Sequence, residues 1–182
     1  MQTAIDEGVA ALGKLDIVVG NAGICIIASW DEVTPEIWNE TISTNLTGTF
    51  NTVQLAAPPL IAAGGGSIIL TGSPTGITGE GRDFTAYSAS KAGIHGLART
   101  VAAAYAEHGI RVNTVVPGYT ETGLVTSISS HPASRAAIVG RIPLGRPGSP
   151  ADVEGIMVFL ASDDASFATG AMFTVDGGMT TL

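Results

Sequence analysis

The sequence predicts an α/β fold in which helices cover a doubly wound parallel sheet. Segments with helical spacing of apolar residues alternate along the chain with short continuous apolar runs. The chain also holds 24 glycines and only 5% aromatic residues, which favours tight turns and close packing of helices on a sheet. Its 182 residues, 45% of them hydrophobic, are enough for one compact domain spanning residues 1–182.

The first half of the chain alternates helix and strand twice. Apolar residues in "MQTAIDEGVAALG" recur at helical spacing, and Gly13 ends that helix before "LDIVVGNAG". This second run is apolar and continuous, as expected of a strand that is buried on both faces. Residues 34–63 then have a helical period, and "GGGSIILTGS" is typical of a turn followed by a strand.

The second half continues the alternation. Residues 86–108 form a long predicted helix, "GIRVNTVVPG" a strand and loop, residues 150–161 another helix, and "GAMFTVDGG" the last strand. Right-handed crossovers join strands that alternate with helices, so the sheet should be parallel. Ligands bind such sheets beyond the carboxyl ends of the strands. The candidate binding residues therefore follow the strands and are Asn21, Ala22, Gly23, Ser73, Pro117 and Gly118.

Charge and cysteine content narrow the class of protein. Eight basic and sixteen acidic residues give a net charge of −8, and the basic residues are scattered, so we expect no nucleic-acid partner. The N-terminus has no basic segment, and no apolar run approaches the roughly 20 residues that span a bilayer, so we expect a cytoplasmic protein without a membrane partner. Cys25 is the one cysteine and is expected to be a small buried group, and no Cys/His spacing indicates a metal site.

The stretch "TAYSASKAG" places Tyr87 and Lys91 four residues apart near the start of a predicted helix. Residues at this spacing share one face, so both side chains can reach the same cavity. A neighbouring ammonium favours the phenolate, and we expect Lys91 to lower the pKa of Tyr87 from its ordinary value near 10. Ser73, at the end of a predicted strand, has a hydroxyl that can hydrogen-bond a substrate oxygen. Taken alone, the serine would more simply serve the turn.

Several segments, in order, resemble the short-chain dehydrogenase/reductase family. They are "NAG" at 21–23, the asparagine of "STNLTG", the serine of "LTGSPTG", "YSASK", "RVNTVVPG" and the ending "GRPGSPADVEGIMVFLASDDASFATGAMFTVDGG". The resemblance covers essentially the whole chain, and several ordered motifs are far more specific than any one of them. It implies a Rossmann-type sheet and an oxidoreductase that transfers a hydride between NAD or NADP and a secondary alcohol or ketone.

The resemblance also implies a catalytic tetrad of Asn45, Ser73, Tyr87 and Lys91. Tyr87 would exchange a proton with the substrate oxygen, which Ser73 positions, while Lys91 lowers the tyrosine pKa and holds the nicotinamide ribose. Asn45 would support a water that links the lysine to solvent. These roles suit hydride transfer, because negative charge develops on the carbonyl oxygen and must be stabilised and protonated.

The cofactor site is implied by the same resemblance. Small residues would approach the adenine-side ribose, and residues after a later strand would flank the nicotinamide. The implied residues are Asn21, Ala22 and Gly23 on the ribose side, Pro117, Gly118 and Thr122 on the nicotinamide side, and Tyr87 and Lys91 beside the ring. Residues 123–141 would form a lid over a small to medium, partly apolar substrate. Family tetramers imply a homo-oligomer, a tetramer or dimer, through helices 45–63 and 86–108, with a second contact from the last strand and residues 150–161.

Two positions depart from the family pattern. Gly20 stands where the family often has an asparagine, and the interval from Ser73 to Tyr87 is one residue longer than usual, which indicates an insertion in "TGEGRD". The insertion leaves open that Thr71 or Thr75 shares the role of the serine. The three histidines, His95, His108 and His131, have no ligand spacing and are expected at the surface or on a helix face.

The family's opening strand and glycine-rich TGxxxGxG turn have no counterpart in this sequence. That turn places the pyrophosphate at a helix N-terminus, so we expect an N-terminally truncated domain whose "LDIVVG" strand is an unpaired apolar edge. Two hypotheses follow. The first is an NAD- or NADP-dependent oxidoreductase, and the alternative is a non-catalytic remnant that acts as a binding or structural subunit.

Overall fold

The computed structural model describes residues 1–79, 83–128 and 131–181. Its sheet has four parallel strands in the order β1-β2-β3-β4, which confirms the predicted doubly wound α/β architecture. The strands are β1 Ile17–Gly20, β2 Gly66–Thr71, β3 Ile110–Pro117 and β4 Met172–Val175. The helices are α1 Gln2–Leu12, α2 Pro35–Ile42, α3 Gly48–Ala62, α4 Thr85–Tyr105, α5 Gly123–Ile128, α6 Pro132–Val139 and α7 Pro150–Ala161.

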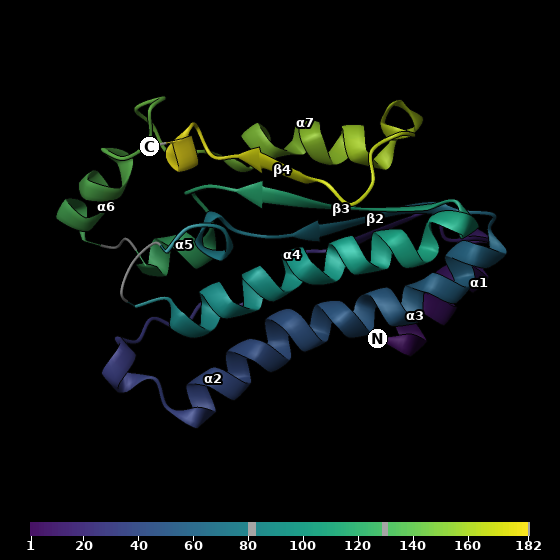
Figure 1. The fold of residues 1–182 in the computed structure, drawn as a ribbon, viewed down its shortest axis with the longest axis horizontal. Helices are drawn as coiled ribbons and strands as arrows, with labels where there is room; N and C mark the ends of the chain where they lie inside the picture. The colour runs from purple at the N-terminus through teal and green to yellow at the C-terminus, as the bar shows by residue number, and fades with distance from the viewer. Residues whose placement is uncertain (80–82, 129–130, 182) are drawn as a thin grey trace.

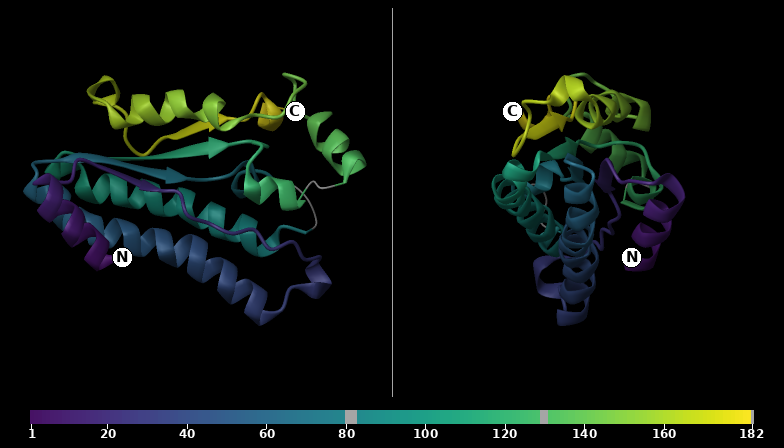
Figure 2. Two further views of the ribbon diagram at one scale, coloured as in Figure 1. Left: turned by 180° about the vertical axis from the view of Figure 1, so that it is seen from behind. Right: turned by 90° about the vertical axis from the view of Figure 1, so that its right-hand side faces the viewer.

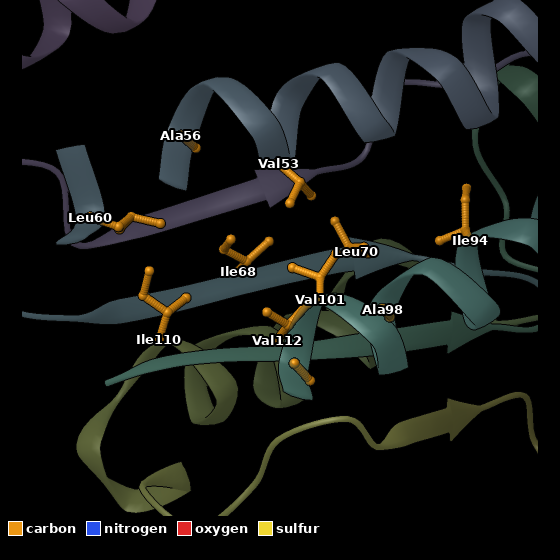
Figure 3. Packing of buried hydrophobic residues seen from close by; sticks show 11 residues of the cluster. Val53, Ala56, Leu60, Ile68, Leu70, Ile94, Ala98, Val101, Ile110 and Val112 are labelled. Atoms are coloured by element: carbon orange, nitrogen blue, oxygen red, sulfur yellow. The ribbon is translucent and has the colours of Figure 1, made fainter. Parts of the chain in front are cut away.

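Helices lie on both faces of the sheet. Helices α3 and α4 run along one face, and α7 runs along the other (Figure 1), as the end-on view in Figure 2 also shows. The main core lies under α3 and α4, where side chains such as Val53, Leu60 and Val101 meet Ile68 and Val112 of the strands (Figure 3). A second, smaller core lies between α7 and the sheet. These two layers hold the carboxyl ends of the strands in fixed positions.

Strand β1 departs from the prediction that it is buried on both faces. Val18 packs against the core under α3, whereas Ile17 and Val19 are 45% and 47% exposed. Successive side chains of a strand point to opposite faces, and α7 contacts β2, β3 and β4 on the second face. Within the described ranges β1 also pairs with β2 alone. The strand is therefore an apolar edge, as the sequence predicted.

The predicted helical run over residues 34–63 is confirmed but contains a local irregularity. Thr34 caps its start by accepting a hydrogen bond from the Ile37 N–H at 3.3 Å, and Pro35 occupies the first turn. Between α2 and α3 the chain forms a π-helical turn, η2, over Ser43–Thr47. Such turns widen a helix by one residue and often accompany functional sites.

Glycine ends the first helix where the sequence predicted. Gly13 adopts φ +84°, a left-handed conformation that glycine reaches without steric cost, and its N–H donates to the Val9 carbonyl. In the portions of the chain that the structure describes, no helix combines the length and apolar character needed to cross a bilayer.

Candidate active site

The carboxyl ends of β1, β2 and β3 open onto a cavity of about 1190 Å³. Segments far apart in the sequence meet there because parallel strands end at the same edge of the sheet. All of the predicted site residues except Asn45 line this cavity, namely Asn21, Ala22, Gly23, Ser73, Tyr87, Lys91, Pro117, Gly118 and Thr122. Asn45 is fully buried and lies outside the lining.

Lys91 lies on the inner face of α4 and is 4% exposed. Its ammonium donates a hydrogen bond of 2.8 Å to the Thr71 carbonyl at the end of β2, and Nζ lies 5.6 Å from the centroid of the Tyr87 ring. Burial lowers the pKa of Lys91 to about 8, and the nearby Cys25 thiol acts in the opposite direction. The two side chains therefore share one face and one cavity, as the four-residue spacing predicted.

Tyr87 and Ser73 form the second pair. Burial raises the pKa of Tyr87 to about 12, while a side-chain hydrogen bond with Ser73 lowers it and Cys25 raises it further. The expected lowering of the Tyr87 pKa by Lys91 is not found: the ammonium lies over the ring, 5.6 Å from its centroid, and the cost of removing the phenolate from water dominates. Ser73 is 7% exposed, and its hydroxyl accepts a hydrogen bond of 3.1 Å from the Thr75 hydroxyl.

Asn45 sits in the π-helical turn η2 and joins three segments. Its side-chain amide donates to the Ile24 carbonyl at 2.9 Å and to the Ser90 hydroxyl at 3.0 Å, and its side-chain oxygen accepts from the Ile24 N–H at 2.8 Å. Ser90 in turn donates to the Tyr87 carbonyl at 2.7 Å. Asn45 therefore fastens the segment after Gly23 to the helix that carries Tyr87 and Lys91.

The two threonines considered as alternatives to Ser73 have different partners. The Thr71 hydroxyl donates to the Asn21 side-chain oxygen at 2.9 Å, so it supports the segment after β1. Thr75 lies beside Ser73 and supports that hydroxyl directly. At Gly20, the position that departs from the family pattern, an added Cβ would lie 2.8 Å from Leu70 Cδ2, so the leucine side chain would have to shift.

Phe84 and Cys25 line the cavity, although the sequence indicated no site role for either residue. Phe84 lies with its ring centroid 6.5 Å from that of Tyr87, and a backbone bridge joins it to Ala28. Cys25 is partly buried and lines the cavity, and burial raises the pKa of its thiol to about 11 against the opposing effect of Lys91. The position of Cys25, two residues after Gly23, was a usable signal, whereas Phe84 follows the inserted segment and had none.

The lid segment and the histidines complete the comparison with the sequence. Helices α5 and α6 lie within residues 123–141, the segment predicted to be a lid, and Leu124, Val125 and Ile138 of these helices line the cavity. His95 was expected at the surface or on a helix face. It is on the helix, but it is 4% exposed because it faces inward against Gly72 and Gly76, which follow β2. Residues 80–82 of the insertion lie outside the described residues, and among those described no cluster of three or more His, Cys, Asp or Glu could hold a metal ion.

Comparison with known proteins agrees with this architecture. A family model described as enoyl-(acyl carrier protein) reductase matches residues 1–180. The cyclohexanol dehydrogenase of an Acinetobacter species is 38% identical over 181 residues, which are 99% of this chain and 70% of that protein.

Two solved structures are similar over the full chain. One is a gluconate 5-dehydrogenase from Burkholderia cenocepacia in complex with NADP and tartrate, with TM-score 0.95 and 35% identity, covering 100% of this chain and 71% of that one. The other is a short-chain type dehydrogenase/reductase from Mycobacterium marinum, with TM-score 0.95 and 36% identity and the same coverage. The extent of these matches and the convergence of the family's motif residues on one cavity lead to one conclusion: the chain belongs to the short-chain dehydrogenase/reductase family.

Proposed function

We propose that this chain interconverts a secondary alcohol and a ketone, using NAD or NADP as its cofactor. The carrying observation is that the Ser73, Tyr87 and Lys91 side chains line one cavity at the carboxyl ends of parallel strands. Cyclohexanol dehydrogenase and gluconate 5-dehydrogenase, two relatives, are named for the oxidation of alcohols, and the second holds NADP. This supports the same class of reaction here.

The residues of the cavity suit a nicotinamide cofactor. Ligand cavities are usually about 300 to 1,000 Å³, so a volume near 1190 Å³ leaves room for a cofactor and a substrate together. Gly23 allows the backbone to lie close to two site residues, because an added Cβ would lie 3.2 Å from Asn45 Oδ1 and 3.6 Å from Lys91 Nζ. The Lys91 ammonium and the Tyr87 hydroxyl can donate hydrogen bonds to the hydroxyl groups of a ribose. When bound, the nicotinamide would supply or accept the hydride.

Within this proposal, Tyr87 is the acid and base. In alcohol oxidation the hydroxyl proton of the substrate would pass to the phenolate form of Tyr87, the C–H bond would break with transfer of its hydride to the oxidised nicotinamide, and the C=O bond would form. In ketone reduction Tyr87 returns that proton to the oxygen. Ser73 donates a hydrogen bond to the same oxygen, where negative charge develops, and so stabilises it.

Lys91 and Asn45 support Tyr87 without contacting the substrate oxygen in this proposal. The Lys91 charge, 5.6 Å from the phenol ring, favours the phenolate that burial otherwise disfavours. Asn45 holds Ile24 and Ser90 in place, which keeps the wall of the cavity against α4. The substrate would be small to medium and partly apolar, because Phe84, Leu124 and Ile138 line its end of the cavity.

The test is turnover of a panel of ketones and secondary alcohols, followed by the absorbance of the reduced nicotinamide. We expect Tyr87→Phe to lower turnover by at least about two orders of magnitude, because general acid-base catalysis typically contributes that much. The variant keeps the ring contact with Phe84, so its melting temperature should be unchanged. Tyr105→Phe, at the far end of the same helix, is the matched control and should keep full turnover.

The alternative is a non-catalytic subunit, which the uncovered apolar face of β1 favours. Absence of turnover of the ketones at saturating NADH and NADPH, and of the alcohols at saturating NAD⁺ and NADP⁺, with the chain folded, would support it. Near-normal turnover by Tyr87→Phe would instead refute the acid-base role of the tyrosine while leaving the reaction class intact. Homo-oligomer formation through α3 and α4 stays a prediction, and a folded monomer in sedimentation velocity at micromolar concentration would contradict it.

A further inference from the structure

His95 extends the helix face that carries the two central residues of the candidate site. It lies four residues after Lys91 and eight after Tyr87 on α4, so the three side chains share one side of the helix. Its side chain is 4% exposed. Because this buried histidine lies on the same helix face as the proposed acid-base pair, the groups that it contacts indicate its role.

The imidazole is wedged against the two glycines that stand on either side of the Ser73 turn. A Cβ added at Gly72 would lie 2.3 Å from His95 Nε2, and one added at Gly76 would lie 3.1 Å from His95 Cε1. The first distance is far below van der Waals contact, and the second is tight, so the ring fits because these positions lack side chains. His95 thus contacts the backbone both before and after Ser73.

The turn itself is a compact unit that rests on α4. The Gly76 N–H donates to the Ser73 carbonyl at 3.0 Å, and the Ile77 N–H donates to the Pro74 carbonyl at 2.8 Å. A Cβ added at Gly76 would lie 2.7 Å from the Ala92 nitrogen, so the turn backbone touches the helix backbone just after Lys91. Because the turn is compact, movement at its base would carry the Ser73 hydroxyl with it.

The charge state of the ring suits a spacer. Burial lowers the pKa of His95, the charges of Arg99 and Lys91 lower it further, and a hydrogen bond with the Gly76 carbonyl opposes them. In the part of the chain that the structure describes, Nε2 is buried without a hydrogen-bond partner. The neutral ring is therefore held chiefly by packing between the two glycines, with its other nitrogen available to donate toward Gly76.

We propose that His95 is a positioning residue that fixes the Ser73 turn against α4 and thereby sets the distance between the Ser73 hydroxyl and the Tyr87 phenol. Its effect on catalysis rests on the proposed function. Its effect on the turn does not, so the two can be tested separately.

The first test is amide hydrogen exchange, measured by NMR on the 182-residue chain. In His95→Val the amides of Gly76 and Ile77 should exchange about tenfold faster or more, because the base of the turn loses its support, while amides of β3 stay protected. His95→Gln keeps an amide donor for the Gly76 carbonyl and should recover much of the protection. His108→Gln, an exposed histidine beyond the end of α4, should change nothing.

Two outcomes of this test would overturn the proposal. Unchanged exchange in the turn of His95→Val would show that the ring does not hold it. An equal rise in the turn and in β3 would show an ordinary core residue whose loss weakens the whole domain.

If His95→Val does not fold, a double-mutant cycle with the shorter polar variant His95→Asn provides the decision. Gly72→Ala introduces a Cβ against His95 Nε2, so it should lower the melting temperature less in the His95→Asn background than in the wild-type chain. If the ring did not contact Gly72, the effects of the two substitutions on the melting temperature would simply add, and the proposal would be wrong.

The catalytic consequence is measured last. Displacement of the serine hydroxyl by a fraction of an ångström to 1 Å should lower kcat of His95→Val by about tenfold to a hundredfold, with the KM for NADH unchanged and partial rescue in His95→Gln. Unchanged kcat with a loosened turn would remove the link to catalysis. Absence of turnover in the wild-type chain would count against the proposed function, and hydrogen exchange would still decide the role of His95.

Discussion

Tyr87 and Lys91 share one face of α4, yet burial moves their pKa values in opposite directions. It raises the pKa of the phenol to about 12 and lowers that of the ammonium to about 8, because in each case the neutral form is easier to bury. The phenolate that proton transfer needs must therefore be stabilised by its neighbours. The Ser73 hydroxyl and the Lys91 charge are placed to do so.

The buried lysine predicts a specific pH dependence of stability. Its folded pKa of about 8 lies below its ordinary value of 10.5, so the folded chain releases the proton more readily than the unfolded chain. The stability contributed by this group is thus full above pH 10.5 and lost as the pH falls to about 8. We expect the melting temperature of Lys91→Met, relative to wild type, to be highest at pH 7 to 8 and to decline toward pH 10.5.

Calorimetry across this range, with the two proteins in the same buffers, provides the measurement. Parallel pH profiles for the two proteins would show that Lys91 is not destabilised by burial. Lys91→Met should also weaken NADH binding if the ammonium holds the ribose, and an unchanged dissociation constant would count against that role.

At the scale of elements, the π-helical turn η2 has a clear structural purpose. It turns the Asn45 side chain toward Ile24 and Ser90, where it makes three hydrogen bonds with distances of 2.8 to 3.0 Å. A regular α-helix through these residues would place that side chain differently, since each turn would be shorter by one residue. The irregularity in the helix thus fixes the segment after β1 at the cavity wall.

Asn45→Ala should therefore destabilise the chain by about 2 to 4 kcal/mol, because it leaves the Ile24 N–H and carbonyl without their partner. Asn51→Ala, at an exposed position of α3, is the matched control and should be neutral or slightly stabilising, since alanine favours helix. Chemical denaturation measures both. A loss of less than about 0.5 kcal/mol for Asn45→Ala would mean that water replaces these bonds without cost.

Strand β1 shows how adjacent residues of one element can face different surroundings. Val18 packs in the core, whereas Ile17 is 45% exposed on an edge strand, and apolar edges of this kind promote association of sheets. Ile17→Lys should reduce aggregation of the chain with little loss of melting temperature. Val18→Lys, one residue further, should unfold it.

Light scattering during concentration, combined with thermal denaturation, distinguishes the two variants. Equal aggregation of Ile17→Lys and wild type would show that this edge is not the site of association. A folded Val18→Lys would contradict the assignment of faces.

At the scale of the whole molecule, the chain covers 70% to 71% of the relatives described above. The family resemblance implies a glycine-rich TGxxxGxG turn that binds the pyrophosphate, and the present sequence has no such motif. We expect the 182-residue chain to bind NADH or NADPH at least about a hundredfold more weakly than the same chain extended upstream by a strand and a TGxxxGxG turn. Charge-assisted hydrogen bonds contribute roughly 1.5 to 3 kcal/mol each, and the loss of two gives at least that factor.

Titration by nicotinamide fluorescence provides the comparison. The extension should also pair with β1 and so improve solubility, which offers an independent readout. Low-micromolar binding of NADH by the soluble 182-residue chain would show that the glycine-rich turn is dispensable.

The sequence by itself determined the order and kind of the strands and of the helices that cover the sheet. The helix at 150–161 was placed to the residue, Gly13 ended the first helix as expected, and Tyr87 and Lys91 were placed on one face of α4. These features depend on local properties: the spacing of apolar residues, the conformational freedom of glycine and the helical repeat. Motif residues after each strand were also predictable, since parallel strands bring their ends together.

Only the tertiary structure decided the remaining features. The burial of His95, the π-helical turn at Asn45 and the exposure of Ile17 each depend on which segments pack against them from elsewhere in the chain. The pKa of Tyr87 belongs to the same group, because it is set by burial among residues distant in sequence rather than by the lysine four positions away. A linear pattern records which side chains share a face, but desolvation depends on what covers that face.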